Sequence, residues 1–250
     1  MAGKTSAQFE GVRFDIKSPY DEDKALLVLN SLVGRLRSRL AKSTILPPIE
    51  KEGIAKPRPS ASQTLPGFWD VITFRFAGKD PFTRHPHLTV WISDDTSIQI
   101  ILPNDARDYW KRLTSVSDEE LESALRKVMT DVRRQRRTLG GGLWEPRLYL
   151  EVVQRHFHAR RYEIEDGRMR FDLDVVFAGG VPTVKHNRAW LGALRLVIAQ
   201  HQHANMQLGL KVRFPFAERS VSRTPQFVDA AAKAAEALEP FLALLAQPGR

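Results

Sequence analysis

Histidine is the first residue type in this sequence whose spacing could support chemistry. Six of the seven histidines occur in His-x-His pairs, at positions 85/87, 156/158 and 201/203. Side chains two residues apart share one face of a β-strand but diverge by about 200° on a helix, so only a pair on a strand can chelate one metal ion. Pro86 favours an extended backbone between His85 and His87. These two histidines are therefore the candidate metal ligands.

Two carboxylates could complete such a metal site. Asp172 and Asp174 share one side of a predicted strand and could bind a divalent cation together with His85 and His87. The metal would activate water for hydrolysis, provided that strands distant in sequence converge. The chain lacks GxxxxGKS/T, GxGxxG, HExxH and GxSxG, the usual indicators of nucleotide, dinucleotide, zincin and α/β-hydrolase chemistry. The sequence leaves open whether the protein is an enzyme and whether it holds a metal.

Basic residues are concentrated in the middle of the chain. The net charge is +9 with a pI of about 10.0, and residues 126–170 carry twelve Arg or Lys against six Asp or Glu. A helix that begins at SDEE, where Ser117 and Glu120 have capping-box spacing, would place these cations on its outer face. The predicted surface for nucleic-acid phosphates or another acidic partner consists of Arg126, Lys127, Arg133, Arg134, Arg136 and Arg137. A merely solvated helix face is the alternative.

The stretch RRYEIEDGRMRFDLD (160–174) carries opposite charges around an Asp-Gly turn signal. With Asp166 and Gly167 as a two-residue loop, a hairpin would pair Glu165 with Arg168, Glu163 with Arg170 and Arg161 with Asp172. The other side of this ribbon would be apolar. We expect a hairpin that neutralises its own charges.

Composition limits the class of protein. With 250 residues and 42% hydrophobic content the chain can bury one large core. No apolar run approaches the roughly 20 residues of a membrane helix, and the N-terminus lacks the apolar stretch of a signal peptide. The absence of cysteine excludes disulfides and thiolate chemistry and is compatible with a reducing compartment. We expect a cytoplasmic protein without a membrane partner.

The order of helical and strand-like runs predicts an α+β fold. Helices are expected at 18–42, 104–113, 117–138, 187–203 and from Thr224 onwards with a kink at Pro240, and strands at 69–76, 87–92, 97–102 and 208–216. We expect residues 147–158 to be helical. The segment 43–67 has five prolines and is expected to be a surface connection. The prediction is a single domain over 1–250, with antiparallel sheet packed by several amphipathic helices, because regular βαβ alternation is missing.

Three blocks resemble an uncharacterised bacterial family of similar length. They are RFAGKDPFTRH (75–85), GGGLWEP (140–146) and the C-terminal LKVRFPF with TPQFVDAAAKAAEALEPFLALL. The family pattern is roughly R-F-S-K-D-K-x-P-Y-K-x-H, followed by G-G-G-x-W/Y-x-P and a C-terminal helix. The matches in the first block, with one position deleted, are Arg75, Phe76, Pro81, Phe82 and His85. The resemblance implies a shared α+β fold and no assigned activity.

Two functions therefore remain from the sequence. The first is a non-catalytic module that binds nucleic acid or phosphate through the basic helix face. The second is a metal-dependent hydrolase that uses His85 and His87. Neither hypothesis sets the oligomeric state of the protein.

Overall fold

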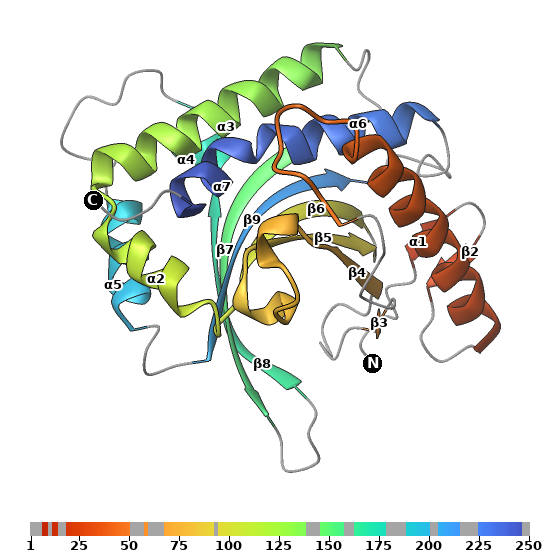
Figure 1. Ribbon diagram of the computed structural model, residues 1–250, viewed down its shortest axis with the longest axis horizontal. Coiled ribbons are helices and arrows are strands. Elements are labelled where there is room, and N and C mark those ends of the chain that lie inside the picture. The colour runs from red at the N-terminus through yellow and green to blue at the C-terminus, as the bar shows by residue number, and fades with distance from the viewer. Residues whose placement is uncertain are drawn as a thin grey trace.

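The computed structural model is built around an antiparallel sheet of seven strands in the order β3-β4-β5-β6-β9-β7-β8 (Figure 1). The structure describes residues 7–9, 12–14, 19–50, 58–59, 68–92, 95–138, 146–157, 163–178, 189–200, 205–215 and 225–246. The strands are β3 (Arg58–Pro59), β4 (Phe68–Ile72), β5 (His87–Ile92), β6 (Asp95–Leu102), β7 (Arg147–Phe157), β8 (Glu163–Asp172) and β9 (Met206–Pro215). A separate two-stranded sheet pairs β1 (Ala7–Phe9) with β2 (Val12–Phe14).

The strands predicted at 69–76, 87–92 and 97–102 are confirmed as neighbouring antiparallel strands, β4, β5 and β6. β4 pairs with β5 and β5 with β6, both antiparallel. The first of these strands is shorter than predicted, because the chain after Ile72 forms an isolated bridge at Phe74 and the 3-10 turn η1 (Arg75–Ala77). A second turn, η2 (Phe82–Arg84), precedes β5.

Alternation along the strands gives the sheet one apolar side. A single row across five strands consists of Leu88, Ile100, Leu210, Leu150 and Phe171. The first four are fully buried, and Phe171 packs against the same core. This is the periodicity of two that a half-buried strand shows. The apolar side of the sheet therefore faces the helices.

The helices cover this apolar side, as Figure 1 shows for α3 and α6. Their buried side chains belong to the same core as the strand residues. The helices are α1 (Pro19–Leu40), α2 (Arg107–Ser115), α3 (Asp118–Thr138), α4 (Leu173–Val176), α5 (Ala189–Ala199), α6 (Pro225–Ala237) and α7 (Glu239–Ala246). α1 packs against β4 and α6, and α3 packs against α6 and α7.

Local sequence signals explain two of the helix boundaries. At the start of α3, Ser117 Oγ accepts a hydrogen bond from the backbone N–H of Glu120, and Glu120 Oε2 accepts one from the N–H of Ser117. This reciprocal capping satisfies two amides of the first turn. The predicted kink near Pro240 is a break between α6 and α7 at Leu238, because proline cannot donate to the preceding turn.

Residues 147–158 are not a helix. β7 runs from Arg147 to Phe157, and its side chains alternate, with Leu148 and Leu150 in the core and Glu151 on the other side. The helical prediction was wrong because β7 lies between two strands, β9 and β8, and both sides of its backbone are paired. Tertiary pairing outweighs the weak local preference.

The hairpin predicted within 160–174 is also wrong. Glu163–Asp172 is one strand, β8, which pairs with β7 in nine residue pairs. The short hairpin could have formed about five residue pairs, so pairing with β7 gives β8 more cross-strand pairs and backbone hydrogen bonds. Asp166 and Gly167 lie at an irregularity in the register rather than at a turn, because Gly167 lies opposite Gln154 and Glu165 opposite Arg155. Arg161, part of the predicted pairing, lies outside the described residues.

The predicted α+β class is confirmed. Antiparallel strands and helices share one hydrophobic core, with the helices packed on the sheet. Within the described part of the chain, no helix is long and apolar enough to span a bilayer.

Candidate functional site

The side of the sheet opposite the core carries polar residues. The row next to the apolar row consists of Thr89, Gln99, Lys211, Tyr149 and Asp172. Exposure changes along this side. Thr89 and Gln99 on β5 and β6 are buried, whereas Arg168 and Arg170 on β8 are exposed. The polar side is thus exposed along β8 and at Arg147 of β7, whereas Lys211 and Glu151 between them are largely buried.

Five cations gather on the polar side of β7, β8 and β9. We call them the cationic sheet face, and they are Arg147, Arg168, Arg170, Lys211 and Arg213. They come from three adjacent strands, of which β9 begins 34 residues after β8 ends. Arg147 lies directly opposite Arg213 on the neighbouring strand. Arg147 also interacts with the Tyr149 hydroxyl and with the charges of Asp172 and Asp174.

Glu151 is the carboxylate at the centre of this face. Its side chain is only 6% exposed and contacts two cations, with Arg170 Nε at 2.6 Å from Oε1 and Lys211 Nζ at 3.5 Å from Oε2. Burial alone would raise the pKa of Glu151, but the charges of Lys211, Arg170 and Arg168 outweigh it and hold the pKa below its ordinary value. Glu151 is therefore ionised at neutral pH and is already committed to protein cations.

The second described carboxylate on this face is committed as well. Asp172 Oδ1 accepts hydrogen bonds from the backbone N–H groups of Asp174 and Val175, at 2.9 and 3.3 Å, and so caps α4. Arg170 also lies 5.3 Å from the centre of the Tyr149 ring, which is within the range of a cation–π contact. Among side chains whose placement is described, the face has five cations and two carboxylates.

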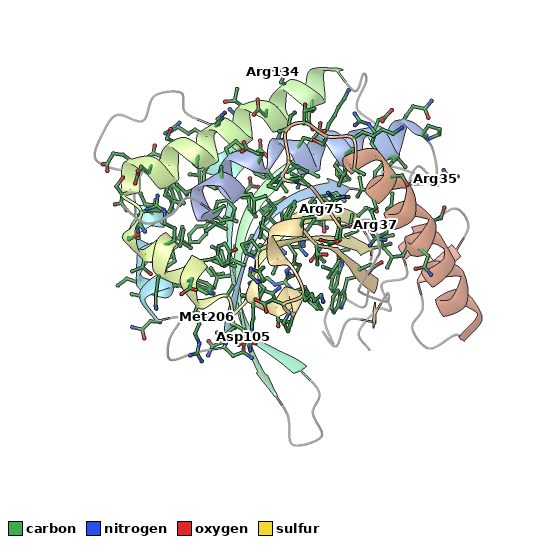
Figure 2. The ribbon with its side chains drawn as sticks, viewed as in Figure 1. Arg35, Arg37, Arg75, Asp105, Arg134 and Met206 are labelled. Atoms are coloured by element: carbon green, nitrogen blue, oxygen red, sulfur yellow. The ribbon has the colours of Figure 1, made fainter. Side chains whose placement is uncertain are left out.

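The cations predicted on α3 are arranged differently. Arg126 donates from Nε and Nη2 to Glu122 Oε1, at 2.9 and 2.7 Å, and its guanidinium lies 4.5 Å from the centre of the Phe177 ring. Arg133 Nε lies 3.8 Å from Asp174 Oδ1. Arg134 lies on the outer side of α3, with Nη1 at 3.2 Å from Asp131 Oδ1 (Figure 2). The described arginines of α3 are therefore interspersed with carboxylates.

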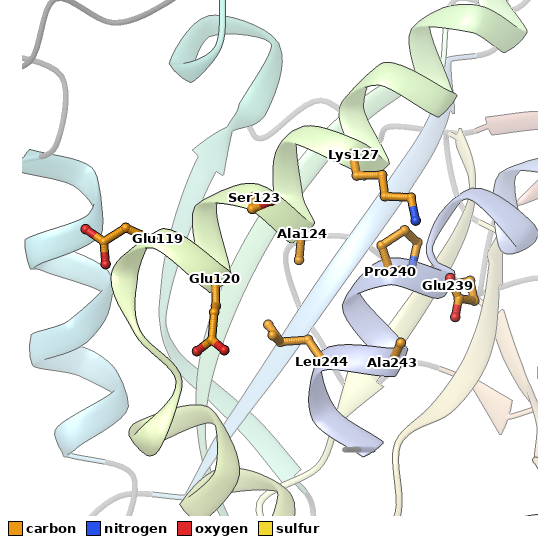
Figure 3. A pocket seen from close by; sticks show the side chains of 9 residues that line it. All are labelled: Glu119, Glu120, Ser123, Ala124, Lys127, Glu239, Pro240, Ala243 and Leu244. Atoms are coloured by element: carbon orange, nitrogen blue, oxygen red, sulfur yellow. The ribbon is translucent and has the colours of Figure 1, made fainter. Parts of the chain in front are cut away.

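Of the other three cations predicted on α3, Lys127 lies at a pocket, and the side chains of Arg136 and Arg137 are not described by the structure. Lys127 lines an open pocket of about 600 Å³ between α3 and α7, with Glu119 and Glu120 from α3 and Glu239 from α7 (Figure 3). Its lining is acidic. Arg136 and Arg137 belong to α3, but their side chains are outside the described residues. The structure thus brings Arg126, Lys127, Arg133 and Arg134 onto one helix without forming one continuous basic area from them.

His85 belongs to a chain of hydrogen-bonding side chains. Its Nδ1 lies 3.1 Å from the Tyr109 hydroxyl and its Nε2 lies 3.3 Å from Asp80 Oδ2. Burial, followed by the charge of Asp108, raises the pKa of Tyr109, so this phenol stays protonated at neutral pH. These hydrogen bonds join the turns before β5 to α2.

His87 is buried and neutral. Its Nδ1–H donates to the backbone carbonyls of His85 and Phe82, at 3.0 and 3.1 Å. Burial lowers the pKa of His87 to about 4, although these carbonyls oppose the shift. Three of the four ring nitrogens of His85 and His87 therefore already have protein partners.

The predicted carboxylate ligands do not join these histidines. Asp172 ends β8 and His87 begins β5, which lie four strand spacings apart in the sheet, or roughly 19 Å. Asp174 instead contacts Arg133 and accepts a hydrogen bond from the N–H of Leu148. In the part of the chain that the structure describes, no three His, Asp or Glu side chains are grouped closely enough to hold a metal ion.

The sequence contains a local signal for only part of the cationic sheet face. The alternation in LGLKVRFPF places Lys211 and Arg213 on the side away from the core, and the structure confirms that placement. Glu151 and Arg147 were missed because their segment was predicted to be helical. The signal that could have found them is the alternation of RLYLEVV (147–153), with Leu, Leu and Val at every second position.

The residues that match the first block of the family resemblance lie in one region of the fold. Arg75, Phe76, Pro81, Phe82 and His85 belong to the turns η1 and η2 and the residues beside them. Phe76 is 40% exposed and its ring lies 6.2 Å from that of His85. The resemblance remains a prediction. Comparisons of the chain with models of known protein families, with curated proteins and with solved structures found no match.

Proposed function

We propose that this protein is a non-catalytic module that binds nucleic-acid phosphates through the cationic sheet face. The observation that carries the proposal is the gathering of Arg147, Arg168, Arg170, Lys211 and Arg213 on one side of three adjacent strands. Guanidinium and ammonium groups supply most contacts to phosphate oxygens in such interfaces. A rigid sheet fixes the spacing of these groups.

The charge balance of this face supports an anionic ligand. Both described carboxylates are engaged, since Glu151 binds Arg170 and Lys211 while Asp172 caps α4. A phosphate placed between Arg147 and Arg213, which lie directly opposite each other, would be attracted by both guanidinium groups. Contacts of this kind neutralise phosphates without reading bases, so binding should tolerate changes in sequence.

The cationic sheet face is a better candidate than α3. On α3 the described arginines Arg126, Arg133 and Arg134 each lie within 4 Å of a carboxylate of their own chain. On the sheet face Arg170 and Lys211 also lie within 4 Å of a carboxylate, but they share a single one, Glu151, so fewer negative charges accompany the cations there. We therefore assign the α3 cations to stabilising the helix exterior and its contact with α4.

The test compares matched charge removals on the two surfaces. Arg147→Gln/Arg213→Gln removes two positive charges from the sheet, and Lys127→Gln/Arg134→Gln removes two from α3. Binding of labelled single-stranded and duplex oligonucleotides is measured by fluorescence anisotropy between ~50 and ~200 mM salt. If both sheet arginines contact phosphates, the slope of log affinity against log salt falls by about 1.4 on single strands and about 1.8 on duplex.

The α3 variant should keep the wild-type affinity and slope. The opposite result, in which only Lys127→Gln/Arg134→Gln weakens binding, would move the interface to the helix. Absence of binding by the wild-type protein at ~50 mM salt, where phosphate contacts are strong, would reject nucleic acid as the ligand. Circular dichroism of each variant verifies that the fold is intact.

A further inference from the structure

Phe76 in the turn η1 is an aromatic ring with one open face. The fully buried ring of Phe74 stacks on it, with 5.3 Å between the ring centres and 21° between the ring planes. The rings of His85 and Tyr109 lie 6.2 and 6.5 Å from it. The residue is nevertheless 40% exposed. Because Phe74 covers one face, the opposite face is the part of the ring that a ligand can reach.

The ring is held in place before any ligand arrives. In the backbone of η1, the N–H of Arg75 donates to the carbonyl of Pro48 at 2.7 Å, and the N–H of Gly78 donates to the carbonyl of Arg75 at 3.0 Å. Beside the ring, His85 is fixed by the Tyr109 hydroxyl at 3.1 Å, and the rings of His85 and Tyr109 lie 5.8 Å apart. A ligand that stacks on such a ring has little protein motion to freeze, which favours its affinity.

Four exposed cations belong to the same turns and to the start of α2. They are Arg75, Lys79, Arg84 and Arg107. Arg75 directly precedes the ring of Phe76, and Arg107 lies two residues before Tyr109. Within the part of the chain that the structure describes, none of these four side chains has an ion-pair partner. Their charges are therefore available to an anionic ligand.

The carboxylates of these segments do not cancel the positive charge. Residues 75–85 and 105–111 carry five Arg or Lys against three Asp. Asp80 Oδ2 lies 3.3 Å from His85 Nε2, and Asp108 Oδ1 lies 3.8 Å from Lys111 Nζ. The region thus combines an open aromatic face with an excess of positive charge. A ligand that matches both features has a flat ring and a negative charge next to it.

We propose that Phe76 is a stacking site for an unpaired base of single-stranded nucleic acid, whose phosphates contact the neighbouring cations. Aromatic side chains bind single strands in this way, and they tolerate changes in sequence because every base has a flat π face. In a duplex the faces of each base are covered by its neighbours, so the site favours single strands. This site goes beyond the phosphate contacts of the cationic sheet face and does not depend on them.

A comparison of an intact strand with an abasic one tests the stacking. The probes are two labelled single-stranded oligonucleotides of equal length and charge, one with bases and one without, and binding is measured by fluorescence anisotropy at ~50 mM salt. The wild-type protein should bind the intact strand about tenfold more tightly than the abasic strand. Phe76→Ala should abolish this preference, whereas Phe76→Trp, which keeps an aromatic face, should retain it.

Val175→Ala provides the matched control, because Val175 is an apolar residue of α4 that is 71% exposed. This variant should keep the wild-type preference. Equal affinities of the wild-type protein for the intact and the abasic strand would overturn the proposal, as would an unchanged preference in Phe76→Ala.

Photo-cross-linking tests the site in the wild-type protein, independently of any variant. A single strand that contains 5-iodouracil is bound, irradiated and digested with trypsin, and mass spectrometry locates the adduct. The adduct should lie on the peptide that contains Phe76. Adducts found only on other peptides would contradict the proposal.

The same probes separate this site from the cationic sheet face. Arg147→Gln/Arg213→Gln removes phosphate contacts and should weaken binding of the intact and the abasic strand by the same factor. If only Phe76→Ala weakens binding, the sheet face is rejected and the stacking site stands. If only the arginine variant weakens binding, the stacking site is rejected and the sheet face stands.

Discussion

Lys211 Nζ lies 3.5 Å from Glu151 Oε2, on neighbouring strands of the sheet, and the two side chains are 12% and 6% exposed. An ammonium and a carboxylate this far from water each lose hydration, which their mutual attraction and hydrogen bonds must offset. Arg170 adds a second cation on the other carboxylate oxygen. The three side chains form an ion cluster on which the polar side of the sheet depends.

The first prediction concerns removal of the negative charge. Glu151→Gln leaves Lys211 without its buried counterion, and we expect it to lower the free energy of unfolding by about 3 kcal/mol. Urea denaturation followed by circular dichroism measures this loss. In the double variant Glu151→Gln/Lys211→Met no buried ammonium remains, so most of the lost stability should return. A double variant that is less stable than Glu151→Gln would contradict this coupling.

The second prediction concerns acid. The pKa of His87 is about 4 in the folded protein, compared with 6.5 for a histidine in the unfolded chain. Between pH 6.5 and 4 the unfolded chain therefore binds a proton at this residue that the folded protein does not bind. Stability is fully present above pH 6.5 and falls as the pH drops towards 4, by about 3 kcal/mol in total. The pKa of Glu151 is lowered instead, so its contribution is lost at still lower pH, as the pH falls through the folded pKa.

Two variants test whether His87 causes the loss of stability between pH 6.5 and 4.5. In His87→Gln the amide can still donate to the carbonyls but does not titrate, so its stability should change little between pH 6.5 and 4.5. His85→Gln removes the neighbouring imidazole, leaves His87 in place and should retain the drop. Urea denaturation midpoints across this pH range provide the measurement. A wild-type midpoint that stays constant from pH 6.5 to 4.5 would show that His87 is not buried as a neutral ring.

The fold was predictable where local signals and tertiary pairing agree. The Ser117–Glu120 cap, the alternation in LGLKVRFPF and the proline break before α7 each specify an element through neighbouring residues alone, and the structure contains all three. β7 and β8 were mispredicted because their conformation depends on partners distant in sequence. β7 pairs with β9, which begins 49 residues after β7 ends, and no local pattern encodes that contact.

The candidate site was less predictable than the fold for the same reason. Residue type and spacing identified the cations of α3, but which carboxylates lie beside them is decided by packing, as in the contact of Arg133 with Asp174. The cationic sheet face draws Arg147 and Arg213 together from strands that meet only in the folded protein. The sequence shows these residues only as positive charges at distant positions. The order of the strands in the sheet is what makes them neighbours.

The last prediction concerns Arg195, which joins three elements. Its Nη1 donates to the carbonyl of Leu113 at 2.9 Å, its Nη2 to the carbonyl of Val116 at 2.6 Å and its Nε to Asp118 Oδ1 at 2.7 Å. The planar guanidinium of Arg195 on α5 thereby ties the end of α2 to the start of α3.

A lysine ammonium is a point charge and cannot reach three acceptors arranged around that plane. Arg195→Lys should therefore cost about 2 kcal/mol in the free energy of unfolding, measured by urea denaturation. Arg134→Lys, at an exposed position of α3, is the matched control and should change stability by less than about 0.5 kcal/mol. Equal stabilities of the two variants would mean that one strong contact, to Asp118, accounts for all that Arg195 contributes.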